Sequence, residues 1–335
     1  GMIITELITV DETHRYMHRS MTLAEDSYVD SHRELTDRIH AHGAKILPQI
    51  SHTGPESVAP MFGGPQTVGP SVAVAPVWGW ASRELDIAEL PAIAIQYGEA
   101  ARRAREAGYD GMELHGAHCY NLIGSFLSPL RNKRTDDYSA FKAETRTRFV
   151  AEVMAEIRAR AGEDFPVVFS ISGYERMPGG RAIDDTQRIA RDLVAAGVSA
   201  FRVSGGISDP LVTMMVSPSE SGYGHNVAQA EALKNVVDVP IILVGRLHDP
   251  EVSEEILQQG QADLVAMARP LLADPYLPQK VVGGRPERIR RCISCENCID
   301  SMQTHDNLGC AINPFSGREG DLEISRGNRK VVVVG

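Results

Sequence analysis

The sequence predicts a protein of the α/β class: a TIM-type (β/α)8 barrel that lacks its first strand, followed by a small cysteine-rich segment. Short apolar runs rich in Val and Ile alternate with longer amphipathic stretches, and strands repeatedly followed by helices indicate a parallel sheet. Several helix-like stretches end in glycine, the usual residue after a helix C-terminus. A length of 335 residues, 43% of them hydrophobic, suits two average domains or one large barrel.

Seven apolar runs are predicted as strands because each is short and continuously apolar, as in strands covered on both faces. They are MIIT (2–5), KILPQ (45–49), DGMEL (110–114), PVVFSI (166–171), AFRVS (200–204), PIILV (240–244) and ADLVAM (262–267). Such strands fit either a doubly wound open sheet or a closed barrel. A (β/α)8 barrel needs eight strands and this chain opens directly on one, so we expect one strand to be missing at the front.

Four amphipathic stretches are predicted as helices, at residues 93–107, 145–161, 184–196 and 249–259. Gly108, Gly197 and Gly260 directly follow three of them and are expected to end them. The long connection at 52–90 is rich in Pro and Gly, which is typical of a functional or mobile loop. Its two tryptophans, Trp78 and Trp80, either anchor the loop on the barrel or line a pocket.

The chain divides into a barrel at 1–285, a cysteine-rich segment at 286–325 and a short tail at 328–335. The tail reads as the start of a truncated dinucleotide-binding domain, since KVVVVG is a strand that runs into a glycine. The G-x-G-x-x-G motif of such a domain is not in the chain.

Composition and net charge indicate which kinds of partner the protein binds. The formal net charge is −10 and no basic run is present, which argues against nucleic acid. No stretch approaches the length of a membrane span, and the N-terminus lacks a signal pattern. We therefore expect a cytoplasmic protein that acts on a small molecule, with neither membrane nor nucleic-acid partner; a homo-oligomer is compatible with the sequence.

Four of the five cysteines form the motif C-x2-C-x2-C-x11-C at Cys292, Cys295, Cys298 and Cys310, and Cys119 stands alone. Clustered C-x2-C spacing in a large, cysteine-poor chain indicates a metal site and not a disulfide framework. Four thiolates bind either a [4Fe-4S] cluster or a structural zinc ion. Three consecutive cysteines spaced by two residues favour the cluster.

Two further stretches follow the last two predicted strands: GRLHDPE (245–251) and MARPLLADP (267–275). In (β/α)8 barrels the loops after strands seven and eight commonly bind phosphate, and Arg246 and Arg269 suit that role. The alternative for Arg269 is an ion pair with Asp274 at the barrel rim.

A third stretch, ELHGAHCYNLIGSFLSPLRNKRTDDY (113–138), places His115, His118 and Tyr120 just beyond a strand. Barrel enzymes carry their reacting groups at this end of the strands. The two histidines are alternatively metal ligands or hydrogen-bonded rim residues.

Together these stretches resemble the Old Yellow Enzyme family, and in particular its branch with dienoyl-CoA reductase and trimethylamine dehydrogenase. The matching pieces are H-G-A-H-x-Y, F-L-S-P-x-x-N-x-R-x-D-x-Y, V-G-R-x-x-D-P, A-R-P-x-L-A-D-P and the cysteine segment. The resemblance implies a barrel that binds FMN at its C-terminal mouth, an adjacent [4Fe-4S] cluster, and a downstream FAD and NAD(P)H domain that this chain lacks.

Residue by residue, the resemblance assigns Gln49 to the flavin ring, and His115 and His118 to the carbonyl oxygen of an unsaturated substrate. It assigns Tyr120 as the proton donor. Its FMN phosphate loops correspond to Gly245, Arg246, Ala268 and Arg269. The implied reaction reduces the C=C bond of an α,β-unsaturated carbonyl with a hydride from FMN, electrons arriving through the cluster.

This chain departs from the family pattern at three places. The family usually has Arg or Lys, next to the flavin N1 and O2, where this chain has Ser170. We therefore expect a lower flavin potential unless another cation substitutes. The usual Gly-Gly after D-x-Y is Ser139-Ala140, and the usual arginine after H-x-G is Pro55.

Two other functions compete with enoate reduction. One is the dehydrogenation or demethylation of a methylated amine, as in trimethylamine dehydrogenase, which has a tyrosine where this chain has His115. The other is a non-catalytic electron-transfer module. The histidine pair favours enoate reduction.

Overall fold

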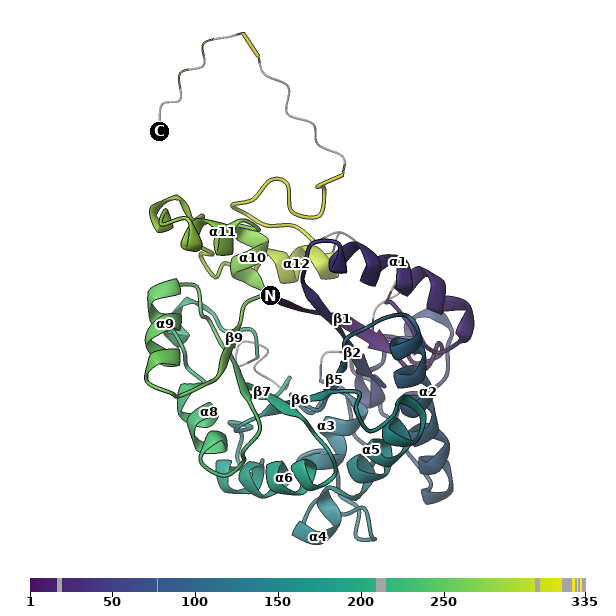
Figure 1. The fold of residues 1–335 in the computed structure, drawn as a ribbon. Helices are drawn as coiled ribbons and strands as arrows, with labels where there is room; N and C mark the ends of the chain where they lie inside the picture. The colour runs from purple at the N-terminus through teal and green to yellow at the C-terminus, as the bar shows by residue number, and fades with distance from the viewer. Residues whose placement is uncertain are drawn as a thin grey trace.

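Seven parallel strands form one curled sheet and follow one another around it in chain order (Figure 1). The computed structural model describes residues 1–16, 20–76, 78–208, 215–304 and 308–320, together with 327, 328, 330 and 332. All seven predicted strands are confirmed. They are β1 (Met2–Thr9), β2 (Lys45–Ser51), β5 (Met112–His115), β6 (Val167–Ser172), β7 (Ala200–Ser204), β8 (Ile241–Val244) and β9 (Leu264–Ala266).

The sheet curls until both edge strands reach the same interior cluster. The buried members of this cluster are Leu47, Val168, Ala200 and Ile242. Ile4 of β1 and Ala266 of β9 pack against it from the two edges of the sheet. Within the described residues β1 and β9 are not hydrogen-bonded to each other. The fold is therefore a TIM-like barrel of seven strands that stays open between β9 and β1, as predicted.

Successive side chains of a strand point to opposite faces, so residues two apart stack in layers inside a barrel. The apolar cluster is the lowest layer. The next inner positions carry polar side chains, namely Gln49, Glu113, Ser170 and Arg202. Two residues further along β5 comes His115, the last residue of that strand. The barrel therefore has an apolar plug, a polar floor above it, and reactive side chains at its mouth.

Helices cover the outside of the sheet (Figure 1). The outer ring contains α1 (Val29–His40), α2 (Leu90–Glu106), α5 (Arg148–Ala161), α6 (Ile183–Ala195), α8 (Val227–Lys234) and α9 (Pro250–Gln258). The four predicted helices are confirmed to within three residues at their ends, whereas α1 and α8 were not predicted. The glycines that follow α2, α6 and α9 have φ of +87°, +98° and +69°, as the helix-ending role requires.

Shorter helices, strands and turns lie at the mouth of the barrel and at the C-terminal end of the chain. They are α3 (Leu122–Leu127), α4 (Ala143–Arg146), α10 (Arg269–Ala273), α11 (Leu277–Val282), α12 (Asn297–Thr304), the strands β3 (Val68–Gly69) and β4 (Arg83–Glu84), and 3-10 turns at Asp26–Tyr28, Gly54–Glu56, Ala59–Phe62, Ile87–Glu89, Ser219–Ser221 and Pro286–Arg288. α10, α11 and α12 lie together at one end of the molecule (Figure 1). Most of the predicted strand at the start of a further domain, 328–335, lies outside the described residues.

The two tryptophans of the 52–90 connection stack on each other. Trp78 and Trp80 are half-buried, with ring centroids 5.8 Å apart and an interplanar angle of 7°. The backbone N–H of Ala75 donates to the carbonyl of Trp80 across the same turn, at 2.9 Å. The contact therefore stabilises the turn of this loop, which favours the anchoring role.

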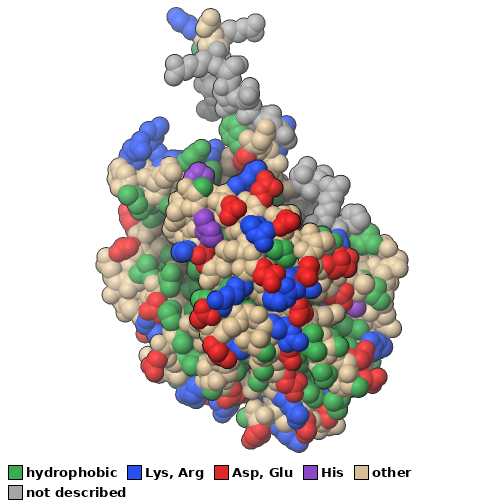
Figure 2. Space-filling model, turned by 45° about the vertical axis from the view of Figure 1, so that its right-hand side comes forward, with side chains coloured by type: hydrophobic (Ala, Val, Ile, Leu, Met, Phe, Trp, Pro, Cys, Tyr) green, Lys and Arg blue, Asp and Glu red, His purple; other side chains and the backbone are tan. Residues whose placement is uncertain are grey.

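Surface charge agrees with the acidic composition. On the face shown in Figure 2, basic and acidic side chains are interspersed and no broad basic area is visible. Several of them pair along the helices, as Arg102 does with Glu99 and Asp26. In the described part of the chain no helix combines the length and the apolar character needed to cross a membrane.

Gly98 permits a close contact between two helices outside the barrel. It lies on the buried face of α2 where that helix packs against α5, and a Cβ at this position would lie 2.7 Å from the carbonyl oxygen of Glu156. That carbonyl belongs to the backbone of α5, so the contact cannot be relieved by a side-chain rotation.

Replacing Gly98 by Ala should therefore destabilise the protein. In an open helix interior this change stabilises by about 0.5–1 kcal/mol, but here it forces α2 and α5 apart, at about 1–3 kcal/mol for overpacking. Denaturant unfolding of the Gly98→Ala variant should show a net loss of stability. A variant as stable as the parent, or more so, would contradict this helix contact.

Candidate active site

The three residues predicted to react come together at the C-terminal end of β5. His115, His118 and Tyr120 are all buried, with 3%, 6% and 8% of their surface exposed. The Nε2 atom of His115 lies 2.6 Å from the hydroxyl oxygen of Tyr120. The rings of His118 and Tyr120 are parallel within 2°, with centroids 6.3 Å apart. This is a preformed cluster of polar groups at the mouth of the barrel.

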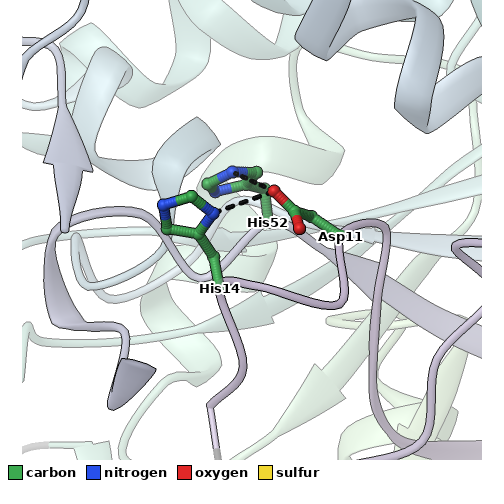
Figure 3. A group of neighbouring side chains, drawn as sticks. All are labelled: Asp11, His14 and His52. Atoms are coloured by element: carbon green, nitrogen blue, oxygen red, sulfur yellow. Dashed lines mark hydrogen bonds and ion pairs between the residues drawn. The ribbon is translucent and has the colours of Figure 1, made fainter. Parts of the chain in front are cut away.

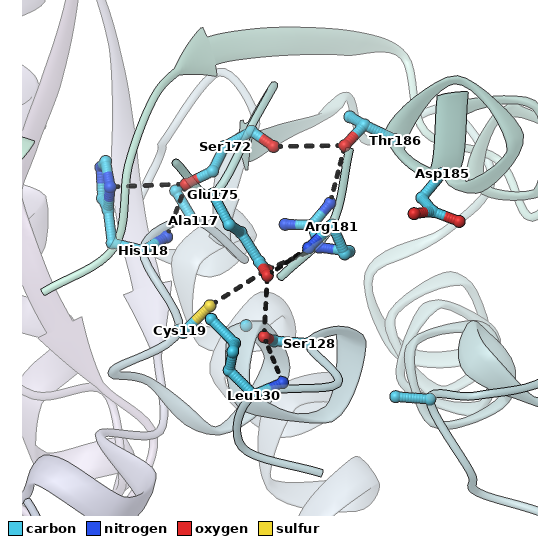
Figure 4. Close-up of polar contacts among 12 residues, drawn as sticks. Ala117, His118, Cys119, Ser128, Leu130, Ser172, Glu175, Arg181, Asp185 and Thr186 are labelled. Carbon is cyan, nitrogen blue, oxygen red and sulfur yellow. Dashed lines mark hydrogen bonds and ion pairs between the residues drawn. The ribbon is translucent and has the colours of Figure 1, made fainter. Parts of the chain in front are cut away.

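An unusual backbone turn brings His118 into this cluster. His118 and Cys119 have φ of 67° and 60°, in the left-handed region, which costs roughly 1–3 kcal/mol per residue and needs support from its surroundings. Ser172, at the end of β6, provides part of it. Its hydroxyl accepts a hydrogen bond from the His118 N–H at 2.9 Å (Figure 4). The same hydroxyl donates to the Gly206 carbonyl at 2.8 Å.

A fully buried ion pair holds the same turn from behind. Glu175 accepts hydrogen bonds from the thiol of Cys119 (3.1 Å), the hydroxyl of Ser128 (3.0 Å) and Nε of Arg181 (2.8 Å) (Figure 4). Burial raises the pKa of the Cys119 thiol well above its ordinary value, so this thiol stays protonated and serves as a donor. Cys119 therefore has a structural role in the turn, as its separation from the cysteine motif indicated.

Burial also fixes the protonation states of the reacting groups. It lowers the pKa of His115 well below its ordinary value and that of His118 to about 4, and it raises that of Tyr120 well above its ordinary value. At neutral pH both imidazoles are uncharged and the phenol keeps its proton. The site therefore offers neutral donors and a proton source.

The hydrogen bonds of the histidines limit which nitrogen carries the proton. Nδ1 of His118 lies 3.2 Å from the Gly206 carbonyl oxygen, which favours a proton on Nδ1 and a lone pair on Nε2. The Gly206 carbonyl also accepts from Ser172, so it keeps a donor when His118 adopts the other tautomer. Nδ1 of His115 is buried and has no hydrogen-bond partner among the described residues.

The polar floor of the mouth contains an ion pair that sequence reasoning missed. Arg202 donates from Nε and Nη2 to Glu113 at 2.6 and 2.7 Å, and from Nη2 to the hydroxyl of Ser170 at 3.0 Å. Gln49 donates to the same carboxylate at 2.6 Å. The predicted Gln49 and Ser170 are thus part of one network. Glu113 and Arg202 are both charged residues at inward-facing positions of otherwise apolar strands. That feature of the sequence could have identified them.

The two predicted phosphate loops lie beyond β8 and β9. Gly245 and Arg246 have φ of 145° and 51°, and the Arg246 guanidinium lies 4.9 Å above the ring of Tyr223. Ala268 directly precedes α10. Arg269 donates from Nη2 to the Ser217 carbonyl at 2.8 Å, and its buried Nη1 has no partner among the described residues.

The alternative of a pair between Arg269 and Asp274 is wrong. Asp274 instead pairs with Lys280 at 2.5 Å and accepts a hydrogen bond from the Arg290 N–H at 2.9 Å. A buried guanidinium nitrogen without a partner is the kind of group that an anion would satisfy.

The four motif cysteines line one cavity. Cys292, Cys295, Cys298 and Cys310 share it with mostly apolar side chains and with Arg269, and none of them forms a disulfide. The intervening Ser294 and Glu296 have φ of 55° and 60°, so the backbone winds tightly around the cavity. The Ser294 N–H also lies 3.4 Å from the Cys292 sulfur. This donor set fits an iron-sulfur cluster, whose sulfurs commonly accept hydrogen bonds.

A second group of potential ligands, Asp11, His14 and His52, lies beyond β1 and β2 (Figure 3). Nδ1 of His14 is 2.8 Å from the Asp11 carboxylate, and Nε2 of His52 is 3.8 Å from it. Nδ1 of His52 accepts a hydrogen bond from the Gly54 N–H, so the proton of this neutral ring is on Nε2. That nitrogen has no lone pair for a metal, and the group is better explained as a hydrogen-bonded anchor for the loop after β1.

A parallel barrel with polar groups at its mouth, two basic loops after its last strands and a four-cysteine cavity beside them fits the pattern of the flavin-dependent enzymes that the sequence resembles. The chain belongs to the NADH:flavin oxidoreductase / NADH oxidase family, whose sequence model matches residues 1–288. This confirms the resemblance to Old Yellow Enzyme.

Three relatives illustrate the range of the family. NADH oxidase of Thermoanaerobacter brockii is 40% identical over 100% of this chain and 52% of its own length. Cinnamate reductase of Clostridium sporogenes is 35% identical over 92% of this chain and 49% of its own length. The structure of histamine dehydrogenase from Rhizobium sp. 4-9 has a TM-score of 0.86 and 27% identity, over 95% of this chain and 46% of its own length. The chain spans about half the length of the curated relatives it matches.

The cysteine cavity leads to a first prediction about this site. Replacing Cys298 by Ser should abolish most of the bound iron and the visible absorption of the anaerobically purified full-length protein. The matched Cys119→Ser variant should retain both, because a hydroxyl can still donate to Glu175. Metal analysis of both variants tests this. One zinc per parent chain, or equal iron loss in the two variants, would contradict the cluster assignment.

The buried His52 leads to a prediction about pH. Burial lowers its pKa to about 3, against about 6.5 in the unfolded chain. Between these values the unfolded state binds more protons, so this contribution to stability is complete above pH 6.5 and is lost as the pH falls. Unfolding free energy measured from pH 7.5 to 4.5 should fall less steeply in His52→Gln than in the parent. The exposed His42→Gln variant should keep the parental slope; equal slopes in all three would contradict the prediction.

Proposed function

We propose that the chain is the catalytic barrel of an FMN-dependent enzyme that reduces the C=C bond of an α,β-unsaturated carbonyl compound. The observation that carries this proposal is the cluster of His115, His118 and Tyr120 above the polar floor. It combines two neutral imidazoles with a protonated phenol at the carboxyl end of a strand. A carbonyl oxygen that gains negative charge and a carbon that needs a proton are the partners suited to this set.

The residues present fit an FMN at the mouth. Gln49 and Ser170 would face the flavin ring from the polar floor. Gly245, Arg246, Ala268 and Arg269 would hold its phosphate, for which the unpartnered Nη1 of Arg269 is available. When bound, FMN supplies the hydride that adds to the β-carbon of the substrate.

The histidines would stabilise charge on the substrate oxygen. As hydride adds, negative charge develops on the carbonyl oxygen, and preorganised donors in a dry site stabilise it more than water does. His115 has a free Nδ1 for this contact. His118 donates from Nε2 once its proton leaves Nδ1, with Ser172 keeping the Gly206 carbonyl hydrogen-bonded. Both groups act uncharged because burial keeps their pKa values low.

Tyr120 would then deliver the proton to the α-carbon. Its raised pKa keeps the phenol protonated at neutral pH, and its hydrogen bond to His115 orients the hydroxyl. The hydride and this proton complete the reduction, and solvent returns a proton to Tyr120. The contact between the Tyr16 and Tyr120 rings, 5.5 Å between centroids, helps to fix the phenol.

Electrons would reach the barrel through a [4Fe-4S] cluster in the cysteine cavity. Arg269 contacts both regions, since it lines that cavity and belongs to a phosphate loop. The curated relatives are about twice as long as this chain. A downstream domain that binds FAD and takes electrons from NAD(P)H therefore remains part of the proposal, and reduced nicotinamide is the reductant.

Oxidation of a methylated amine is the second candidate. It is favoured by the likeness to histamine dehydrogenase and by the neighbouring aromatic rings of Tyr16 and Tyr120, since aromatic faces attract alkylated ammonium groups. The lone pair on Nε2 of His118 would suit an amine N–H. The non-catalytic alternative has less support, because the relatives are named as enzymes.

The enoate reaction predicts different effects for the three reactive residues. His115→Ala and His118→Ala should each weaken phenol binding and slow reoxidation of the reduced flavin by a cyclic enone, by about 10²- to 10³-fold, as for loss of one oxyanion donor. Tyr120→Phe should leave phenol binding nearly intact and slow protonation by roughly 10²-fold or more. Stopped-flow reoxidation of the photoreduced full-length protein measures the rates, and a phenol titration measures binding.

Two outcomes would overturn the assignment. In the first, all three variants reoxidise at the parental rate. In the second, the parent ignores every enone tried and instead oxidises a methylated amine.

A further inference from the structure

We propose that Arg202, on β7, supplies the positive charge that stabilises the reduced flavin, in place of the cation expected one strand away at Ser170. The inference rests on the proposed function to the extent that a flavin occupies the mouth, but not on the identity of the substrate.

Strand register places Arg202 directly beside the position where the family pattern has its cation. Ser170 on β6 is paired with Arg202 on β7, and neighbouring strands lie about 4.8 Å apart. An arginine side chain spans that distance. The guanidinium of Arg202 does reach across, because Nη2 donates to the Ser170 hydroxyl at 3.0 Å. The serine therefore anchors a cation that comes from the next strand.

The guanidinium is fixed on one edge and open on the other. Nε and Nη2 are both engaged by the fully buried Glu113. Among the described residues Nη1 forms no hydrogen bond, and 15% of the side chain is exposed. Nη1 is thus a charged donor held in one orientation and accessible from the mouth, as an acceptor such as a flavin carbonyl requires.

Glu113 offsets this charge only in part, because it acts on Tyr120 but not on the two histidines. Its carboxylate accepts from Gln49 as well as from Arg202, so its lone pairs are directed into the floor. The charge of Arg202 also acts on the three reacting groups. It contributes to lowering the pKa of His115 and of His118, and it partly opposes the rise in the pKa of Tyr120. At the two histidines Arg202 therefore acts as a cation, whereas at Tyr120 the negative charge of Glu113 opposes it and raises the pKa.

The proposal changes the expectation for Ser170. A cation already occupies this corner, so the flavin potential need not be low. Adding a second arginine at Ser170 would place two like charges beside one carboxylate. Moving the arginine, with Ser170→Arg and Arg202→Ser combined, keeps one cation and one serine and should be tolerated.

The test is the flavin midpoint potential of the full-length protein, measured by reductive titration with a reference dye. Arg202→Met, which removes the charge and keeps most of the stem, should make reduction at least about tenfold less favourable, or about 30 mV lower for a two-electron couple. Arg202→Lys and the double exchange should each recover most of this loss. The matched control is Arg103→Met, which changes a largely buried arginine that pairs with Asp26 on the outer face of α2. Its effect on the potential should be less than threefold.

Each outcome decides the proposal. A parental potential in flavin-bound Arg202→Met would overturn it, and so would a double exchange that stays as low as Arg202→Met. If Arg202→Met retains no flavin, the lysine variant and the double exchange decide: parental potentials in both support the role of the charge, and loss of flavin or potential in both contradicts it.

The same experiments separate this inference from the proposed function. A lowered potential in Arg202→Met together with a parent that reduces no enone would support Arg202 and reject enoate reduction. A parent that reduces enones, together with an unchanged potential in Arg202→Met, would support enoate reduction and reject the role of Arg202. A parent that binds no flavin would overturn both.

Discussion

The buried pair of Glu113 and Arg202 is the interaction on which the mouth of this barrel depends. A fully buried carboxylate is tolerated only when it is paired and hydrogen-bonded. Here its partners are Gln49 from the neighbouring strand β2 and Arg202 from β7, which lies one strand beyond β6. Arg202 in turn bonds Ser170 of β6. The network therefore links four adjacent strands at one level and forms the floor on which a ligand can rest.

The reactive groups above this floor depend on a second buried charge. Glu175 and Arg181, both with no exposed surface, hold the turn in which His118 and Cys119 adopt left-handed backbone conformations. The cost of that turn is offset by hydrogen bonds to strand ends and to this pair. The two buried ion pairs thus have separate roles. Glu113 and Arg202 form the floor, and Glu175 and Arg181 hold the turn that places His118 over it.

Much of the fold was predictable because it is periodic. Seven strands and four helices followed from apolar runs, amphipathic stretches and terminal glycines, and motifs located His115 and the cysteines. What the sequence did not reveal were pairings between distant segments. Arg202 and Glu113 are 89 residues apart, and each alone resembles an ordinary charge in a short strand. The Arg269 environment was missed for a similar reason, since its neighbours lie in the cysteine segment and at Ser217. Helices α1 and α8 also went unpredicted.

The central claim is that this barrel holds a flavin at its mouth with an iron-sulfur cluster beside it. The most direct measurement is an absorption spectrum of the anaerobically purified full-length protein, with FMN, iron and zinc quantified per chain. The account predicts one FMN, at least four iron atoms and a broad visible absorption that bleaches on reduction. Absence of FMN, or one zinc ion in place of the iron, would contradict it.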